Sequence, residues 1–317
     1  MVFFMSRIIL RRHPLRWLKR HGWSAEPGVS FVSWLWLAAV LGFAYPAADL
    51  AVTDAADPVA GVIHLADERI TESSGLAKSH RLPGAFWTHN DSGDSARLFA
   101  FAEQGEKRGD CTLAGVKAID FEELDSFLQD GVPRLLVADV GDNRGRRSTV
   151  SLYLFDEPDP CGSTEITDWL QLEFRYPNGP QDCEAITVDA AAGKITLVTK
   201  TFLPRASVYE LDLPPRTANP QQLEPQTARW VGQLPLSLVT AMELDDTSGD
   251  LVVVNYFQLF RFPSPEPGKN WWEQTPKPTD LPRLKQIEAV AVDATGQVWV
   301  TSEGAPAPLA PVIEARP

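Results

Sequence analysis

Acidic residues recur in this sequence at one position of a repeated pattern, where carboxylates that a fold brings together could bind a cation. The pattern is an acid, alternating apolar residues, an Asp, a short turn with Gly and a second apolar run, as in 183–200 and 287–303. Stretches 71–91, 121–139 and 239–256 follow the same template, the last with Thr240 in the acidic place. The recurring acids stand at intervals of roughly 50 to 60 residues and are Glu72, Glu122, Glu184 and Glu288.

The chemistry of such a set depends on how close the carboxylates lie. Like charges gathered in one place cannot all stay ionised without a cation or hydrogen-bond donors. Because only oxygen ligands are on offer, the predicted metal is calcium, and Asp120 and Asp182 extend the set of acids. The alternative is structural: each glutamate accepts hydrogen bonds from backbone N–H groups of a neighbouring repeat.

A second set of polar residues ends the otherwise apolar second run of each repeat. A strand end that is packed toward a channel is where a ligand-binding side chain would stand. Lys200 is the cation of this set; we expect it to pair with a glutamate of the first set, and the alternative is that it holds an anionic group of a ligand. The candidate ligand-binding residues are Asn90, Asp91, Asp139, Lys200, Asn255 and Glu303.

Two similar motifs, HNDSGD (89–94) and DVGDN (139–143), lie at these run ends. Their glycine suits a turn with positive φ, and the flanking aspartates suit the capping of backbone N–H groups. An EF-hand calcium loop is excluded, because DVGDNRGRRSTV has Arg and Thr where later acidic ligands are needed. We expect Arg144, Arg146 and Arg147 to pair with surplus acids; binding of an anionic ligand is the alternative.

Nucleophilic catalysis has little support in the sequence. It has no G-x-S-x-G motif, and Ser73 and Ser74 have no evident partner base. His89 and Asp91 are the one candidate acid–base pair, because alternation along a strand places them on a shared face. A packing role for His89 is the alternative.

Short runs of β-branched and aromatic residues, bounded by Gly and Pro, predict an all-β chain. A period of about 50 residues with about four strands per unit is typical of a β-propeller. We therefore predict five blades of four-stranded antiparallel sheets over residues 59–317, closed by an N-terminal strand in 59–67 that joins the last unit. Six blades, or a β-sandwich, are the alternatives.

Individual strands follow from the same pattern. The predicted fourth strands are 111–118, 169–176, 228–234 and 281–286, and 308–315 is the third strand of the last unit. Residues 120–130, DFEELDSFLQD, are the best candidate for a helical turn.

Residues 1–44 differ from the rest of the chain. Basic residues precede the uncharged apolar run 31–44, which is typical of a secretory signal peptide and short for a membrane-spanning helix of about 20 residues. We predict a signal peptide at 1–44, with an uncleaved N-terminal anchor as the alternative, and a linker at 45–58. The protein is then exported, to the periplasm or the exterior of the cell.

The 317-residue chain is acidic, with a net charge of −13. Residues 1–44 contain six basic residues and one acidic residue, so the rest of the chain carries −18. Such a surface repels nucleic acid and anionic lipid. The predicted partner is a small molecule or a protein, with no nucleic acid, and a membrane only if the N-terminal segment is uncleaved.

In an exported protein we expect a disulfide, although the spacing does not choose a pair among Cys111, Cys161 and Cys183.

The order of several motifs resembles a family of exported bacterial β-propeller proteins, most of them without an assigned function. The motifs are ESSGLA, HNDSGD, DFEEL, DVGDN followed by EP, DCEAITVD, VTAMELD and EAVAVD followed by SEG, across residues 60–310. Phe121 and Glu123 stand where the family tends to have Trp and Asp. The chain is also distantly similar to phytase-like and esterase-like propellers. The resemblance implies a propeller, and the distant similarity a channel rich in carboxylates.

Three functions are consistent with these features. The first is an exported binding or scaffold protein with a carboxylate-lined central channel that binds a cation, with calcium as the predicted cofactor. The second is a metal-dependent hydrolase of phosphate esters, esters or lactones, in which Lys200 or an arginine orients the anion. The third is a structural protein that binds a partner and has an inert channel.

Overall fold

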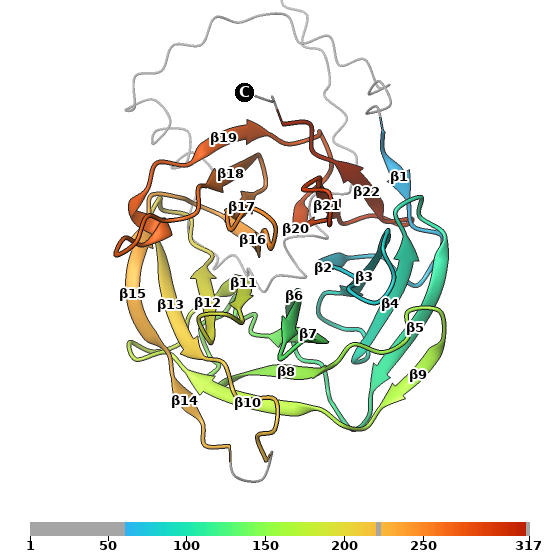
Figure 1. Cartoon of the computed structure of the whole chain (residues 1–317), viewed down its shortest axis with the longest axis horizontal. Helices are drawn as coiled ribbons and strands as arrows, with labels where there is room; N and C mark the ends of the chain where they lie inside the picture. Colours follow the sequence, from blue (N-terminus) through green and yellow to red (C-terminus); the bar gives the residue numbers. More distant parts are fainter. Residues whose placement is uncertain (1–60, 220–222, 315–317) are drawn as a thin grey trace, which may run out of the picture. The chain divides into compact units, whose positions relative to one another are not determined.

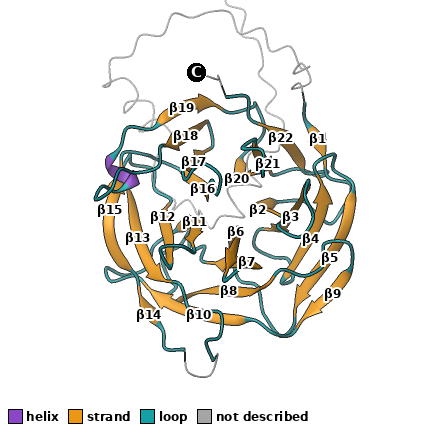
Figure 2. Cartoon of the chain, viewed as in Figure 1, coloured by secondary structure: helices purple, strands orange, loops and turns teal. Residues whose placement is uncertain are grey.

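The computed structural model describes residues 61–219 and 223–314. They form five β-sheets arranged as the blades of a ring (Figure 1). Strands dominate these residues, and the helix that they contain is the short 3-10 helix η2 (Trp271–Glu273) (Figure 2). The predicted five-bladed β-propeller is confirmed, and the six-bladed and sandwich alternatives are excluded.

Blades 1 and 2 each have five strands, which are named below in order from the centre of the ring outward. Blade 1 consists of β2 (Ser73–Lys78), β3 (Ala85–Asn90), β4 (Arg97–Ala102), β5 (Lys107–Leu113) and β9 (Ser163–Ile166). Blade 2 consists of β6 (Phe121–Gln129), β7 (Val132–Asp139), β8 (Val150–Asp156), β10 (Leu170–Arg175) and β14 (Gln226–Thr227). The fifth strands β9 and β14 pair in parallel with β5 and β10. They come from later parts of the chain, so they link neighbouring blades, a feature that the sequence pattern did not predict.

Blades 3, 4 and 5 each have four antiparallel strands. Blade 3 consists of β11 (Cys183–Asp189), β12 (Lys194–Thr199), β13 (Ala206–Asp212) and β15 (Arg229–Leu234). Blade 4 consists of β16 (Val239–Leu244), β17 (Leu251–Asn255), β18 (Gln258–Phe262) and β19 (Lys277–Asp280). Blade 5 consists of β20 (Ile287–Val292), β21 (Val298–Ser302), β22 (Pro308–Pro311) and β1 (Ile63–His64).

The ring closes within blade 5, where β1 pairs with β22. The predicted closure by the N-terminal strand is therefore confirmed, and both ends of the described chain are held in one sheet (Figure 1). Closure removes the unpaired strand edges that an open sheet would expose.

Five apolar cores lie between neighbouring blades. Each combines residues from two adjacent sheets, as Leu136 of blade 2 and Ile186 of blade 3 do in one core, and the same holds for the other four pairs of neighbours. These cores fix the innermost strands β2, β6, β11, β16 and β20 against one another. The side chains that these strands direct toward the centre are thus held on a rigid frame.

Two local predictions were wrong. Residues 120–130 contain strand β6 rather than a helical turn, because tertiary pairing overrides a spacing of apolar residues that also suits a helix. The fourth strand of blade 4 is β19 (Lys277–Asp280), which ends before the predicted 281–286. The other strand predictions place the elements correctly, although β5 begins at Lys107, ahead of the predicted 111.

The predicted signal peptide at 1–44 and the linker at 45–58 lie outside the described residues. Within the part of the chain that is described, no helix has the length and apolar character needed to cross a membrane.

Candidate cation site at the mouth of the ring

The five innermost strands share an irregularity near their first residues. In each blade the pairing between the first and second strands skips one residue of the innermost strand, which forms a β-bulge. A bulge of this kind re-aims the side chain of the extra residue. The skipped residues are Ser74, Glu122, Glu184, Thr240 and Glu288. We call the end of the ring where these strands begin the mouth.

The bulge shows which predicted acids are structurally equivalent. Glu122, Glu184 and Glu288 occupy the same position, and Thr240 replaces an acid there, as the repeat predicted. In blade 1 that position belongs to Ser74, so the expected alignment of Glu72 was wrong by two residues. Glu72 still stands at the mouth, where it forms an isolated bridge with Glu303.

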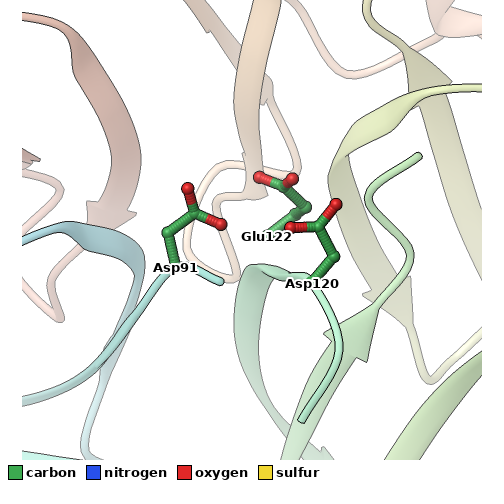
Figure 3. A group of neighbouring side chains, drawn as sticks. All are labelled: Asp91, Asp120 and Glu122. Atoms are coloured by element: carbon green, nitrogen blue, oxygen red, sulfur yellow. The ribbon is translucent and has the colours of Figure 1, made fainter. Parts of the chain in front are cut away.

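Three carboxylates meet at the mouth between blades 1 and 2. One oxygen from each of Asp91, Asp120 and Glu122 lies within 4.8 Å of the other two (Figure 3). Asp91 directly follows β3, while Asp120 precedes β6 and Glu122 is the bulged residue of β6. The structure therefore brings together one residue from each predicted set and Asp120, all turned toward a common gap (Figure 3).

Gly141 of the DVGDN motif makes room for this group. A Cβ atom at that position would collide with the carboxylates of Glu122 and Asp120. The glycine is therefore needed for close approach, and its φ is not positive as the turn interpretation predicted. Gly93 of the first motif does have positive φ, at 92°, so there the turn interpretation is confirmed.

The three carboxylates are poorly compensated by hydrogen bonds. Burial, with the nearby charges of Glu184, Asp91 and Asp120, raises the pKa of Glu122 well above its usual value. Burial and the charges of Asp91 and Asp182 raise the pKa of Asp120 to about 7. No described residue donates a hydrogen bond to the side chains of Asp120 or Glu122. At neutral pH the group therefore favours a bound proton or a bound cation.

Lys200 and Glu184 form an ion pair on the blade 3 side of the mouth. Lys200 Nζ is 2.5 Å from Glu184 Oε1 and 5.0 Å from the centre of the Tyr256 ring. Burial alone would lower the pKa of Lys200, but the Glu184 carboxylate and Tyr256 raise it above its usual value. The predicted pairing of Lys200 with a glutamate is thus confirmed.

Only one of the two carboxylate oxygens of Glu288, in blade 5, has a hydrogen-bond donor among the described residues. Gln286 Nε2 is 3.3 Å from its Oε1, whereas its Oε2 is buried and has no partner among the described residues. Burial and the charge of Glu303 raise the pKa of Glu288 to about 7. Glu303 itself accepts hydrogen bonds from Gln286 and Lys285, both at 2.8 Å.

The second predicted set divides into two positions with different roles. Asn90 and Asp139 each accept two backbone N–H groups from the segment before the innermost strand, and Asn255 caps Phe257 and Gln258. These three residues therefore stabilise the local backbone. Asn90 and Asn255 each lie one residue before the position that faces the mouth, and Asp91, Lys200 and Glu303 occupy that position in three blades. In blade 2 the residue after Asp139 is Val140, which is buried in the core, and Gly141 is the equivalent residue.

Of the three arginines after DVGDN, Arg147 pairs with an acid as expected. Its guanidinium lies 2.8 Å from the carboxylate of Asp139. Asp142 accepts the backbone N–H groups of Arg146 and Arg147, as predicted for a capping aspartate.

His89 is fully buried, with its ring 5.5 Å from that of Phe121 in an edge-on arrangement, so its role is packing. The expected disulfide is not formed, because Cys111, Cys161 and Cys183 are all free.

Two acids deeper along the axis of the ring, Glu123 and Asp125, accept backbone hydrogen bonds. Glu123 Oε1 accepts the N–H of Leu124, and its Oε2 accepts the N–H of Met242 in blade 4, both at 3.1 Å. Asp125 Oδ2 accepts the N–H of Val188 at 2.6 Å and contacts Thr187 Oγ1 at 3.1 Å. Glu123 and Asp125, which lie outside the predicted set of acids, thus stabilise the backbone of other blades. Glu123 crosses the axis from blade 2 to blade 4.

Sequence reasoning missed three residues of the mouth. Tyr256 and Gln286 stand beside Lys200 and Glu288, and Gly141 packs against the acids. An alignment of all five repeats by their bulges would have shown that Tyr256 is equivalent to Lys200 and that Gln286 is equivalent to Asp120. A bulge, however, leaves no clear mark in a single sequence.

The comparisons with known proteins leave the function open. No protein-family model matches the chain, and no curated protein matches it. A solved structure titled "Crystal structure of glucose dehydrogenase" is 10% identical, with a TM-score of 0.49 over 80% of this chain and 99% of that chain. Another, titled "glucose dehydrogenase", is 11% identical, with a TM-score of 0.47 over the same shares. At these scores neither match bears on the activity of this chain.

Proposed function

We propose that the protein is a β-propeller binding protein whose mouth holds a divalent cation, calcium, through Asp91, Asp120 and Glu122. The observation that carries this proposal is the approach of the three carboxylates to within 4.8 Å of one another, while two of them receive no donor from the described residues. Carboxylate oxygens are the ligands that calcium prefers. Zinc is disfavoured, because no histidine or cysteine belongs to this group of the described residues.

The energetics support a cation over a structural role. A carboxylate that is buried beside other carboxylates favours its neutral form, unless a cation supplies the opposite charge. The charge of Lys200 lowers the pKa of Glu122, but Lys200 is bonded to Glu184, and the pKa of Glu122 stays well above its usual value. A site with three carboxylates and open positions for water is suited to moderate affinity, in the range of about 10⁻⁴ to 10⁻³ M that extracellular calcium modules have.

Calorimetric titration of the purified protein with calcium chloride tests this proposal. We expect binding with a Kd of about 10⁻⁴ M, and a stabilisation of about 2.7 kcal/mol at a calcium concentration of 100 times Kd. Glu122→Gln removes one ligand charge with little change of shape and should abolish both effects. Glu266→Gln, at an exposed acid on the β18–β19 connection, is the matched control and should change neither. Binding that is equal in both variants would overturn the proposal.

The alternative function is metal-dependent hydrolysis of a phosphate ester, an ester or a lactone. One observation favours it: Lys200, which keeps its proton, stands at the same mouth as the three carboxylates. A screen with such substrates in the presence of calcium tests this alternative. Activity that disappears in Glu122→Gln and Lys200→Met but persists in Glu266→Gln would establish the hydrolase, and no turnover in the parent protein would leave the binding function.

Export is part of the same proposal. The basic and apolar pattern of residues 1–44 supports it, and a site of moderate affinity suits compartments with abundant calcium. Mass spectrometry of the protein from fractionated cells tests this, with a mature chain that begins near residue 45 as the expected result.

A further inference from the structure

A cavity of about 560 Å³ lies at the end of the ring opposite the mouth, where the innermost strands of blades 2, 3 and 4 finish. Its walls come from the end of β6, from the β11–β12 and β16–β17 hairpins, and from the β18–β19 connection. Small-molecule sites in proteins are usually cavities of about 300–1,000 Å³. The cavity therefore has room for a small organic ligand.

Most of the cavity wall is apolar. It includes Phe127 and Val188, which are buried, and Leu128, which is 49% exposed. Trp271 adds a half-buried aromatic ring, which packs edge-on against Phe262 with 5.4 Å between the ring centres. An aromatic ring packs against apolar groups and also attracts a cation to its face. Leu128 and Trp271 thus offer apolar contact that the described chain leaves partly uncovered.

Among the described residues that line the cavity, those that carry a charge are all acids, namely Asp189, Asp245 and Asp246. Asp245 is buried and is already bonded within its own hairpin and to Arg261. Asp189 is half-buried, and its Oδ1 accepts the backbone N–H of Ala192 at 2.8 Å. The side chain of Asp246 is 45% exposed. Two of the three acids can therefore be reached by a ligand.

The described basic side chains around these acids are already bonded to carboxylates. The pairs are Lys78 with Asp246 at 2.8 Å, His80 with Asp246 at 3.8 Å, Arg261 with Asp245 at 3.3 Å and with Glu314 at 2.6 Å, and Lys194 with Asp212 at 2.5 Å. Lys194 is the partner of Asp189 across the β11–β12 hairpin, but no ion pair joins Asp189 to a described cation. The carboxylate of Asp189 is thus the uncompensated charge of the cavity.

This charge determines the sign of the ligand, because a carboxylate attracts a cation and repels an anion. We propose that the cavity binds a small organic ammonium ion, whose N–H groups donate to Asp189 and whose apolar group packs against Leu128 and Trp271. Asp246 lines the same cavity, but it shares its charge with Lys78 and contributes less.

The ammonium site and the proposed calcium site are at opposite ends of the ring. The ammonium site uses the ends of innermost strands and the hairpins that follow them, whereas calcium is assigned to acids at the mouth, where these strands begin. The two sites share no residue, so the two proposals can fail separately.

Calorimetric titration with three matched compounds at pH 7.5 and low salt tests the ammonium site. 2-Phenylethylammonium has both the charge and the ring, methylammonium has only the charge, and phenylacetate has the ring with the opposite charge. We expect 2-phenylethylammonium to bind at least about tenfold more tightly than methylammonium, because its ring buries apolar surface. Phenylacetate should give no binding heat. No binding of 2-phenylethylammonium, or binding of either other compound that is equally tight, would overturn the proposal.

Two variants of the wall locate the binding. Asp189→Asn should weaken 2-phenylethylammonium binding at least about tenfold, because a charge-assisted hydrogen bond is roughly twice as strong as a neutral one. The amide oxygen of the new side chain can still accept the N–H of Ala192, so the hairpin should fold. Leu128→Ala should weaken binding by a smaller factor, about threefold. Unchanged affinity in Asp189→Asn, with a native circular dichroism spectrum, would exclude the site.

Two further variants are controls. Glu266→Gln removes an exposed acid that adjoins the lining residue Pro265 but does not itself line the cavity, so it should leave the ammonium affinity unchanged. A loss as large as that in Asp189→Asn would mean that the acidity of the whole surface, and not this cavity, attracts the ligand. Asp120→Asn should lose calcium binding and keep ammonium binding; loss of both would show that the two sites are not separate.

Discussion

Glu122 and Glu123 are adjacent on β6, yet their surroundings differ completely. Glu123 accepts backbone N–H groups from two blades, while Glu122 meets Asp91 and Asp120 and receives no donor from a described residue. The cause is the bulge at Glu122, which interrupts the pairing of β6 with β7. Burial raises the pKa of both side chains, but one carboxylate is part of the framework and the other is available to a ligand. Burial alone therefore does not distinguish a structural acid from a binding acid; the donors do.

Removing Glu123 should have the largest effect on stability. Glu123→Ala leaves the buried N–H groups of Leu124 and Met242 without their acceptor, at a cost of about 3 kcal/mol in the free energy of unfolding. Glu122→Gln removes no hydrogen bond and relieves repulsion, so without a divalent cation it should stabilise the protein by about 1 kcal/mol. Urea denaturation in a chelating buffer measures both. Equal losses of unfolding free energy in the two variants would show that the two glutamates do not differ in their structural role.

Gly141 should have the next largest effect. In Gly141→Ala the new Cβ collides with the carboxylates of Glu122 and Asp120, which we expect to cost about 2 kcal/mol and to abolish calcium binding. Gly162→Ala is the control, because the nearest atoms to a Cβ there are 4.0 Å away and its φ is not positive. Thermal denaturation and calcium titration of both variants provide the measurement. Wild-type calcium affinity in Gly141→Ala would contradict the close packing at the mouth.

The dependence of stability on pH should show an effect that is spread over several groups. The folded protein raises the pKa of Asp120 from 3.8 and of Glu288 from 4.5, each to about 7. Their stabilising protonation is complete below about pH 4 and is lost as the pH rises through about 7. In chelator, the free energy of unfolding should therefore fall between pH 5 and pH 8, by up to about 1.4 kcal/mol per pH unit for each group.

Asp120→Asn sharpens this experiment, because it removes one of the titrating groups at the mouth. Its stability should fall less steeply over the same pH range, and added calcium should no longer oppose the fall. A slope equal to that of the parent protein would mean that the mouth does not govern the pH dependence.

Much of the fold could be predicted from the repeat. The alternation in stretches such as 183–200 gave the strands, and the period gave the five blades. The position of 59–67 before the first repeat predicted the closing strand. The parallel strands β9 and β14 could not be predicted, because each pairs with a blade whose other strands come from an earlier part of the chain. Such pairing leaves no local pattern.

The candidate site was predictable only in part. Repetition identified Glu122, Glu184 and Glu288 as equivalent, and the charge of Lys200 predicted its pairing with a glutamate. Asp139 and Asp91 looked alike from the sequence, since both end an apolar run. The structure separates them, because one residue along a strand changes the face on which a side chain lies. Asp139 thus caps the backbone, and Asp91 reaches the carboxylates of blade 2.

The sequence by itself determined the class of fold and the acidic character of the mouth, since both depend on residue types repeated at a regular spacing. Only the tertiary structure decided which acids meet. That outcome depends on five bulges, on the room left by Gly141, and on backbone donors supplied by strands more than a hundred positions away, such as Met242 for Glu123. A hydrogen bond between distant strands is fixed by how the blades pack, so neighbouring glutamates with the same chemistry acquire different roles.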